Sequence, residues 1–306
     1  MVVIMKKIFC FIVICLSLIF TLSCSKEEDS KVTIITPYGI PFISVARLTN
    51  DKSVSIEAVS GSEHLQSSLS SASYDIVIAP LNLGANLYNA GKRCYKIASV
   101  ITSNNAYIVS RVEDPLNSIN DLIDKEIMAF GKNGIPGSLI RKLYQDNDFL
   151  DINNLDNNFF DSSASVYGMF KGSDTIKYAL MSEPEITKLN IKDNINVNTL
   201  DLCSLLNIDF VPQACIFVKE KSDRIDNVLK KIEENINYLI LNNSKFSEEI
   251  ISIDKSLSSM GLDVLTKSMA KANICYMKAS SCKSDIENIL LILNCKAVLP
   301  NEGFYY

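Results

Sequence analysis

Tryptophan is absent from the 306-residue chain, and histidine occurs once, as His64. A metal site built from several histidines is therefore excluded, although a single Ser-His-Asp triad is not. We expect His64 to lie on a solvated helix face. The chain also has no basic excess, because 30 Lys and Arg against 35 Asp and Glu give a formal net charge of −5. Nucleic-acid binding needs a basic surface that neutralises phosphates, so this composition argues against such a partner.

Long apolar runs are missing everywhere except at the N-terminus, where residues 8–22 follow two lysines and precede a serine and Cys24. A positive start, a short apolar stretch and a small residue at the cut are typical of a secretory signal. The cysteine indicates a lipoprotein signal peptide over residues 1–23, with Cys24 diacylated (palmitate or a similar chain) as the new first residue. Residues 24–30 would then be a lipidated tether, and two acyl chains anchor a protein stably to a membrane.

One alternative is an N-terminal transmembrane helix, because the apolar run approaches the length that spans a bilayer. The small residue before Cys24 and the abrupt polar sequence after it favour cleavage instead. Bacterial lipoprotein signals usually carry Leu three residues before the cysteine, whereas this chain has Thr21 there and Leu22 one place late. Residues 1–4 look like an over-extended start, so Met5 is a second candidate for the first residue.

An even number of cysteines follows Cys24, which in an exported protein permits disulfides in any of fifteen pairings. The six are Cys94, Cys203, Cys215, Cys275, Cys282 and Cys295. The last three form the favoured cluster for a bond. A chain of this length does not need such a bond, and no CxxC spacing suggests zinc. We therefore expect free buried thiols.

Short β-branched runs alternate with helical patterns from residue 31 onward. Strands are predicted in a first unit at 32–35, 54–59 and 75–80, and in a second unit at 106–109, 126–130, 177–181, 195–200 and 214–218. Strands that alternate with helices indicate a parallel sheet with right-handed crossovers. Apolar residues at spacings of three and four predict that everything after residue 222 is helical.

Ligands of open α/β sheets lie outside the carboxyl ends of the strands, where loops lead into helix N-termini. The unpaired N–H groups and the helix dipole there suit an anion or a polar heteroatom. Applied to this chain, the rule selects thirteen candidate ligand-binding residues: Pro37, Tyr38, Gly39, Gly61, Ser62, Pro80, Asn82, Ser103, Asn104, Asn133, Gly134, Ser138 and Glu183.

Several of these residues have simpler interpretations. Residues 134–138 also suit an ordinary turn between a strand and a helix. Four aromatic residues near the loops are candidates to flank a planar ligand or to pack in the core: Tyr38, Phe42, Tyr107 and Phe210. Arg47 and Lys132 are the nearest basic side chains for an anionic ligand, but exposed lysines are usually only solvated.

Four segments occur in an order that resembles one known group of proteins. They are residues 37–41, 74–80, 122–131 and 178–184, the last followed by Thr187 and Lys188. Together with the ending at 299–306, they resemble the substrate-binding lipoproteins of ABC importers in the nitrate, sulfonate and thiamine-precursor group. The resemblance covers residues 31–306, and the order of the segments carries it.

The resemblance implies an α/β fold of the periplasmic-binding-protein kind (type II-like), with two lobes and a ligand cleft between them. Each lobe would hold a mostly parallel sheet flanked by helices. Lobe one would take residues 31–104 plus 220–306, and lobe two residues 105–219. Glu183, in a Glu-Pro pair that resembles one of that group, would face the cleft or the hinge. The alternative is a carboxylate at a helix N-terminus with Pro184 in the first position.

The resemblance also implies a function: capture of a small organic solute and its delivery to an ABC permease with its ATPase. The expected receptor is an exported, lipid-anchored monomer without cofactor or metal. The missing tryptophan and the Asp- and Asn-rich segment 146–174 depart from the group and leave the solute unnamed. Two alternatives stay open: a menaquinone-pathway-like enzyme on the same fold, since a fold does not imply one function, and a surface lipoprotein with a non-transport binding role.

Overall fold

The structure is a computed structural model, and it describes residues 31–293 and 299–306. The expected signal peptide, Cys24 and the tether lie outside the described residues, as does Cys295. Residues Val32–Tyr306 form one structural unit. Among the described helices, none has the length and apolar character that a membrane span requires.

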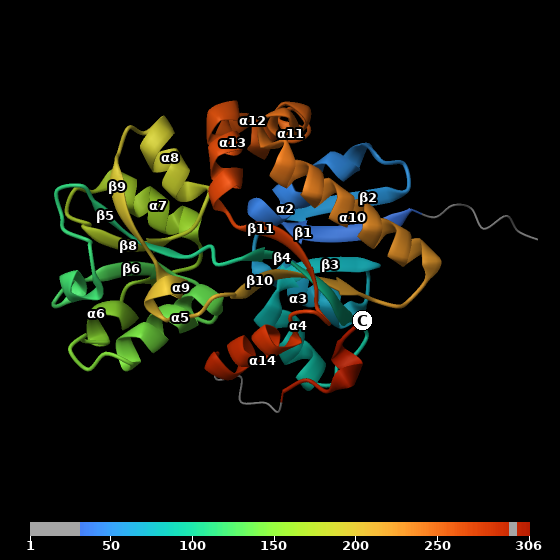
Figure 1. Ribbon diagram of the computed structural model, residues 1–306, viewed down its shortest axis with the longest axis horizontal. Helices are drawn as coiled ribbons and strands as arrows, with labels where there is room; N and C mark the ends of the chain where they lie inside the picture. The colour runs from blue at the N-terminus through green and yellow to red at the C-terminus, as the bar shows by residue number, and fades with distance from the viewer. Residues whose placement is uncertain (1–30, 294–298) are drawn as a thin grey trace, which may run out of the picture. The chain divides into compact units, whose positions relative to one another are not determined.

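The first of two sheets has six strands in the order β11-β4-β10-β3-β1-β2 (Figure 1). Strand β1 runs parallel to β2 and β3, whereas β10 runs antiparallel to β3 and β4, and β11 antiparallel to β4. We call this sheet and the helices that cover it lobe one. Its strands are β1 (Val32–Pro37), β2 (Val54–Val59), β3 (Ile76–Pro80), β4 (Lys96–Ser103), β10 (Pro212–Val218) and β11 (Ile274–Lys278).

The second sheet has five strands in the order β7-β6-β8-β5-β9. Strand β6 runs parallel to β7 and β8, whereas β5 runs antiparallel to β8 and β9. We call this sheet and its helices lobe two. Its strands are β5 (Tyr107–Arg111), β6 (Ile127–Phe130), β7 (Phe159–Phe160), β8 (Tyr178–Met181) and β9 (Val197–Asp201).

Helices cover both faces of the first sheet, which explains why β3 is apolar along its length. One face carries α3 (Ser62–Ser71), α4 (Leu81–Asn89) and α14 (Lys283–Ile292), and the other carries α2 (Ile40–Val45), α10 (Asp223–Leu241), α11 (Asn243–Ile250) and α13 (Leu262–Lys271) (Figure 1). Short elements complete the lobe: η1 (Ala46–Asn50), α12 (Lys255–Met260) and η3 (Glu302–Phe304).

The second sheet is also covered on both faces. One apolar cluster packs it against α7 (Ser163–Gly172) and α8 (Glu185–Lys192). Another packs it against α5 (Ile135–Gln145), α6 (Asn153–Asp156) and α9 (Leu202–Leu205). The 3-10 helix η2 (Ile119–Leu122) precedes β6. This second cluster is continuous with the core around α3, α4 and α14, so one apolar core reaches into both lobes.

The two-sheet α/β architecture predicted from the sequence is confirmed, with four corrections. The sequence predicted no strand at β4 (Lys96–Ser103), whose small and polar residues interrupt the apolar pattern. Strand β10 pairs with β3 and β4, so the prediction that residues 214–218 end lobe two is wrong. Both sheets are mixed instead of mostly parallel, because the chain enters β10 and β5 from the other lobe and runs against its neighbours. Strand β11 interrupts the stretch predicted to be wholly helical, since its run of four apolar residues fits either structure.

Two smaller predictions can also be compared with the structure. His64 is exposed on α3, as expected for a solvated helix face. The five described cysteines are free thiols, and the expectation of free buried thiols is confirmed in full for three of them: Cys203, Cys215 and Cys282. Cys94 is exposed and Cys275 half-buried, whereas the other three are buried.

Candidate functional site

The strand ends selected from the sequence lie at one edge of the first sheet. Pro37 at the end of β1 is paired with Val59 at the end of β2. Pro80 at the end of β3 lies opposite Ala214, near the start of the antiparallel β10. Ser103 at the end of β4 lies opposite Pro212, the first residue of β10. The carboxyl ends of β1, β2, β3 and β4 therefore share an edge with the start of β10.

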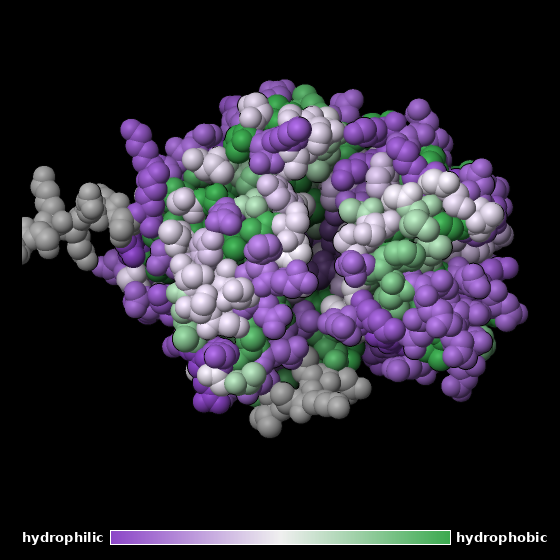
Figure 2. All heavy atoms as spheres, turned by 180° about the vertical axis from the view of Figure 1, so that it is seen from behind, coloured by the Kyte–Doolittle hydropathy of each residue, from purple (hydrophilic) through white to green (hydrophobic). Residues whose placement is uncertain are grey.

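The matching edge of the second sheet contains the start of β5. Tyr107, the first residue of β5, is paired with Met181 at the end of β8 and with Asp201 at the end of β9. Strand β6 runs parallel to β8, so its end at Phe130 lies at the same edge. Residues 104–106 lead from β4 to β5, and residues 202–211 lead from β9 to β10. Because both crossing segments join these edges, the edges face each other, and Figure 2 shows the surface hollowed where the lobes meet.

Four helices begin at these edges without a side-chain cap. The N-cap residues are Gly39 for α2, Gly61 for α3, Pro80 for α4 and Gly134 for α5, and none of them accepts a hydrogen bond from the helix through a side chain. The first N–H groups of a helix have no partner within it and carry a partial positive charge. The helix starts can therefore hold the acceptor atoms of a ligand, with exposed Ser62 and half-buried Ser138 beside them.

Asn82 and Asn133 connect the two lobes directly. Asn82, in the first turn of α4, donates from Nδ2 to the main-chain oxygen of Asn133 at 3.1 Å. Asn133 precedes α5 and has an exposed side chain that takes no part in this bond. Two of the thirteen selected residues, one in each lobe, are therefore in contact.

Asn104 joins the two crossing segments to each other. Its Nδ2 donates to the carbonyl of Asp209 at 2.8 Å, and its Oδ1 accepts from the backbone N–H of Val211 at 2.7 Å. The backbone of Asn104 has a φ of 43°, in the left-handed region that Asn tolerates better than most residues. Asn104 was selected as a ligand contact, and the structure places its side chain in the link between the segments. Its neighbour Ser103 is buried and donates from its backbone N–H to the carbonyl of Asn273 at 3.2 Å.

Asn105 is the residue that sequence reasoning missed. Its Oδ1 accepts from the backbone N–H of Glu183 at 2.8 Å, and its Nδ2 donates to the carbonyl of Glu183 at 3.2 Å. Its own backbone N–H donates to Oε1 of Gln213 at 3.1 Å. Asn105 thereby holds the loop after β8 against the crossing segment. It follows the selected residues Ser103 and Asn104 directly and precedes the strand predicted at 106–109, which was the signal in the sequence.

Glu183 has the capping role that was the alternative to ligand contact. Its side chain is buried, and Oε2 accepts from the backbone N–H of Thr187 in the first turn of α8 at 3.1 Å. Burial raises the pKa of the Glu183 carboxyl, and the positive charge of Lys271 partly opposes that rise. Contact of Glu183 with a ligand stays a prediction, as does contact of the other selected residues.

The aromatic candidates are found in different settings. Tyr38 is 41% exposed and lies edge-on to Phe42 with ring centroids 5.8 Å apart. Phe42 is buried, so the core interpretation holds for it. Phe210 packs against the apolar core. The hydroxyl of Tyr107 donates to the carbonyl of Lys271 at 3.2 Å, and burial raises the pKa of Tyr107 to about 12.

Both basic candidates already have partners. Arg47 lies 2.7 Å from Glu249 and its guanidinium stacks on the ring of Tyr238. Lys132 donates to the carbonyl of Asp156 at 3.5 Å. Neither of these two residues is positioned as a free cation at the sheet edges.

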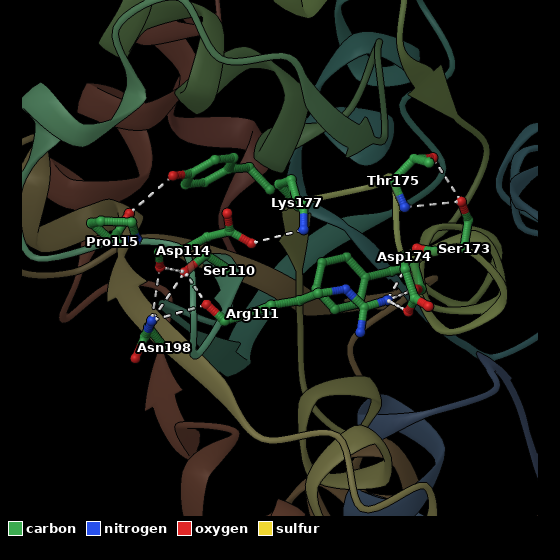
Figure 3. Close-up of polar contacts among 11 residues, drawn as sticks. Ser110, Arg111, Asp114, Pro115, Ser173, Asp174, Thr175, Lys177 and Asn198 are labelled. Carbon is green, nitrogen blue, oxygen red and sulfur yellow. Dashed lines mark hydrogen bonds and ion pairs between the residues drawn. The ribbon is translucent and has the colours of Figure 1, made fainter.

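Two hollows in the surface lie apart from the groove. One, of about 280 Å³, lies beside β2 and is lined by Tyr38, Phe42, Thr49, Asn50, Ile56, Ala58, Ile253 and Asp254. The other, of about 680 Å³, lies at the far edge of the second sheet, where Asp114 pairs with Lys177 at 3.5 Å (Figure 3). There the side chains of Arg111 and Asn198 donate hydrogen bonds to main-chain carbonyls. These bonds attach the turn after β5 to the rest of lobe two (Figure 3).

No family model and no curated protein matches the chain. Solved structures match nearly all of it. An ABC transporter protein from Parabacteroides distasonis is 19% identical, with a TM-score of 0.74 over 90% of this chain and 99% of that one. The alkanesulfonate-binding protein SsuA from Xanthomonas axonopodis pv. citri, bound to MOPS, is 11% identical, with a TM-score of 0.65 over 90% and 98%.

A third similar structure is a Candida albicans gene product described as having the generic periplasmic binding protein structural fold. It is 14% identical, with a TM-score of 0.51 over 90% of this chain and 93% of that one. The chain therefore has the periplasmic-binding-protein fold, as the order of its sequence segments predicted.

Proposed function

We propose that this chain is the solute-binding component of an ABC import system and holds a small polar organic solute between its two lobes. One observation carries the proposal. The strand-end edges of the two sheets face each other across a groove, and helices begin at both edges with uncapped N–H groups. Donor groups on both sides of a groove between two lobes suit capture of a small molecule that carries acceptor atoms.

The solved structures support the same function. The Parabacteroides protein is described as an ABC transporter and the Xanthomonas protein as an alkanesulfonate-binding protein, and both match across nearly their whole length. A fold does not imply a function, so the support comes from the fold together with the positions of the helix starts.

Capture would proceed by closure of the lobes about the crossing segments, which is a hinge motion. A solute drives closure only if it binds the closed form better than the open form. We propose residues 31–104 and 212–306 for lobe one and 105–211 for lobe two, which assigns β10 to lobe one because of its pairing.

Anchoring would keep the receptor beside its permease. Diacylation of Cys24 and the short tether at 24–30 would raise the effective concentration of the receptor at the membrane. Incorporation of a clickable fatty acid into the full chain, and its loss in a Cys24→Ala variant, tests this part. Labelling that persists in the variant would contradict it.

Solute binding is tested with the full chain purified in mild detergent. Isothermal calorimetry against sulfonates, pyrimidine precursors, nitrate and riboflavin should give saturable heat with one class, and X-ray scattering should show contraction with that solute. Absence of binding across the whole panel would overturn the proposal. Chemical conversion of a bound solute by the pure protein would favour the alternative, an enzyme on this fold.

A further inference from the structure

The side-chain amide of Asn82 indicates which chemical group a solute in the groove between the lobes would carry. It belongs to lobe one, in the first turn of α4, and donates from Nδ2 to the main-chain oxygen of Asn133 in lobe two. The two ends of an amide have opposite hydrogen-bonding character, since the NH₂ group only donates and the oxygen only accepts. Each end of Asn82 therefore needs a different partner.

The orientation of this amide follows from its partner. A main-chain carbonyl can only accept, so the Asn82 side chain must present Nδ2 to Asn133. A flipped amide would place two oxygens against each other. The contact between the lobes thus decides that Oδ1 of Asn82 is the atom left for another group.

Oδ1 of Asn82 is buried, and no donor among the described residues reaches it. Buried polar atoms in folded proteins are nearly always paired, so an unpaired acceptor needs an explanation. Asn82 was selected from the sequence because it follows the carboxyl end of β3, where ligands of such sheets bind. A hydrogen-bond donor on the bound solute would supply the missing partner of Oδ1.

We propose that Oδ1 of Asn82 accepts a hydrogen bond from a donor group of the solute, while Nδ2 of the same side chain links the two lobes. The solute class is then a small organic molecule with an O–H or N–H group at Asn82 and acceptor atoms at the uncapped helix starts. Solutes that carry acceptors only, such as nitrate or a simple alkanesulfonate, are excluded as preferred ligands. This inference rests on the proposed function and narrows it.

Matched solute pairs test this preference on the full chain in mild detergent. Isethionate and ethanesulfonate differ by one hydroxyl, and a hydroxymethylpyrimidine can be paired with its O-methyl, N,N-dimethyl analogue. Calorimetry should show that the donor-bearing member of at least one pair binds about tenfold more tightly than its mate, because only that member gains a hydrogen bond to the otherwise unpaired Oδ1. Equal affinities within every pair that binds would overturn the inference and leave the proposed function standing. Failure of all solutes, including the wider panel, would overturn both.

Three variants separate the two ends of the amide. Asn82→Leu removes donor and acceptor at similar size, so the tenfold preference should disappear. Asn82→Asp keeps the acceptor but faces the Asn133 carbonyl with a second oxygen, so both members of a pair should bind more weakly with the preference retained. Asn86→Leu, one turn further along α4 at an exposed position, is the matched control and should bind as the wild type does.

Thermal unfolding followed by circular dichroism establishes that each variant is folded before its affinity is compared. A preference that survives in a folded Asn82→Leu variant would overturn the inference. If that variant does not fold, Asn82→Asp decides: loss of the preference there, despite the retained acceptor, would equally overturn it.

Discussion

The two lobes are joined by buried amide groups at the crossing segments and by single exposed hydrogen bonds elsewhere. At the crossing segments, Asn104 and Asn105 make paired hydrogen bonds to main-chain groups, several of them buried. Elsewhere the contacts are single, such as that from Asn82 to Asn133 and that from Lys192 to the carbonyl of Ser259 at 3.1 Å. Buried unpaired polar groups are costly, whereas exposed ones exchange for water. The crossing segments are therefore expected to stay together when the single contacts break.

The apolar core supports the same distinction. Ala106 and Val211 of the crossing segments belong to a cluster that includes Val77 of lobe one and Ile108 of lobe two. The cluster around α10 and the cluster around α7 and α8 each stay within one lobe. Motion between the lobes would therefore pivot about the crossing segments, with the clusters around α10 and around α7 and α8 moving apart and the shared cluster rearranging between them.

The largest effect should come from Asn105→Leu. Both backbone groups of Glu183 lose their partner, and each unpaired buried group costs about 1–3 kcal/mol, so the free energy of unfolding should fall by about 2–4 kcal/mol. Urea unfolding measures the loss, and hydrogen exchange should rise at residues 182–187. Asn120→Leu at an exposed position is the control. A variant as stable as the control would show that the pivot does not depend on this amide.

A smaller loss is expected for Asn104→Ala. The variant removes the link between the crossing segments and places alanine, which tolerates a positive φ less well than asparagine, at this position, so we expect a loss of about 1–3 kcal/mol. Asn104→Gly removes the same hydrogen bonds but tolerates the φ of 43°. The difference between the two variants in urea unfolding measures the backbone contribution. Equal stability of both would assign the whole effect to the side-chain bonds.

Glu183→Gln tests how the buried carboxyl beside the crossing segments affects the pH dependence of the free energy of unfolding. Burial raises the pKa of this carboxyl in the folded protein, so the folded state binds its proton more tightly than the unfolded state does. The free energy of unfolding should then decrease as pH rises from the ordinary pKa of Glu to the raised value. The variant keeps an acceptor for the N–H of Thr187, loses this pH dependence and gains stability at neutral pH.

The control for the Glu183 prediction is Glu63→Gln at an exposed position on α3. Unfolding in urea across acidic to neutral pH should give the same pH dependence for that variant as for the wild type. If Glu183→Gln follows the same curve, the buried carboxyl contributes nothing to the pH dependence.

The smallest effect should come from Lys192→Ala. This variant removes a single hydrogen bond from an exposed side chain, so the free energy of unfolding should change by less than about 0.5 kcal/mol. Urea unfolding of this variant and of Asn105→Leu in the same buffer compares an exposed contact between the lobes with the buried contacts at the crossing segments. A loss as large as that of the pivot variant would erase the distinction between the two kinds of contact.

Sequence reasoning found the strand ends and loops but not the partners of every strand. Alternation of strands and helices predicted where Asn82, Asn133 and Glu183 lie, because those positions depend on local periodicity and on the rule for strand ends. It missed the strand at Lys96–Ser103, the strand at Ile274–Lys278 and the pairing of β10 with lobe one. Pairing depends on contacts between residues far apart in the chain, which local patterns do not contain.

The sequence by itself determined the fold class, through the order of its strands and helices, while the single histidine and the acidic composition excluded a multi-histidine metal site and argued against nucleic-acid binding. Those properties depend on residue type and on neighbours along the chain. Only the tertiary structure showed that Asn105 holds Glu183 and that Nδ2 of Asn82 is occupied by Asn133 while Oδ1 is not. Which end of an amide is satisfied depends on atoms that folding brings within about 3 Å from distant parts of the chain.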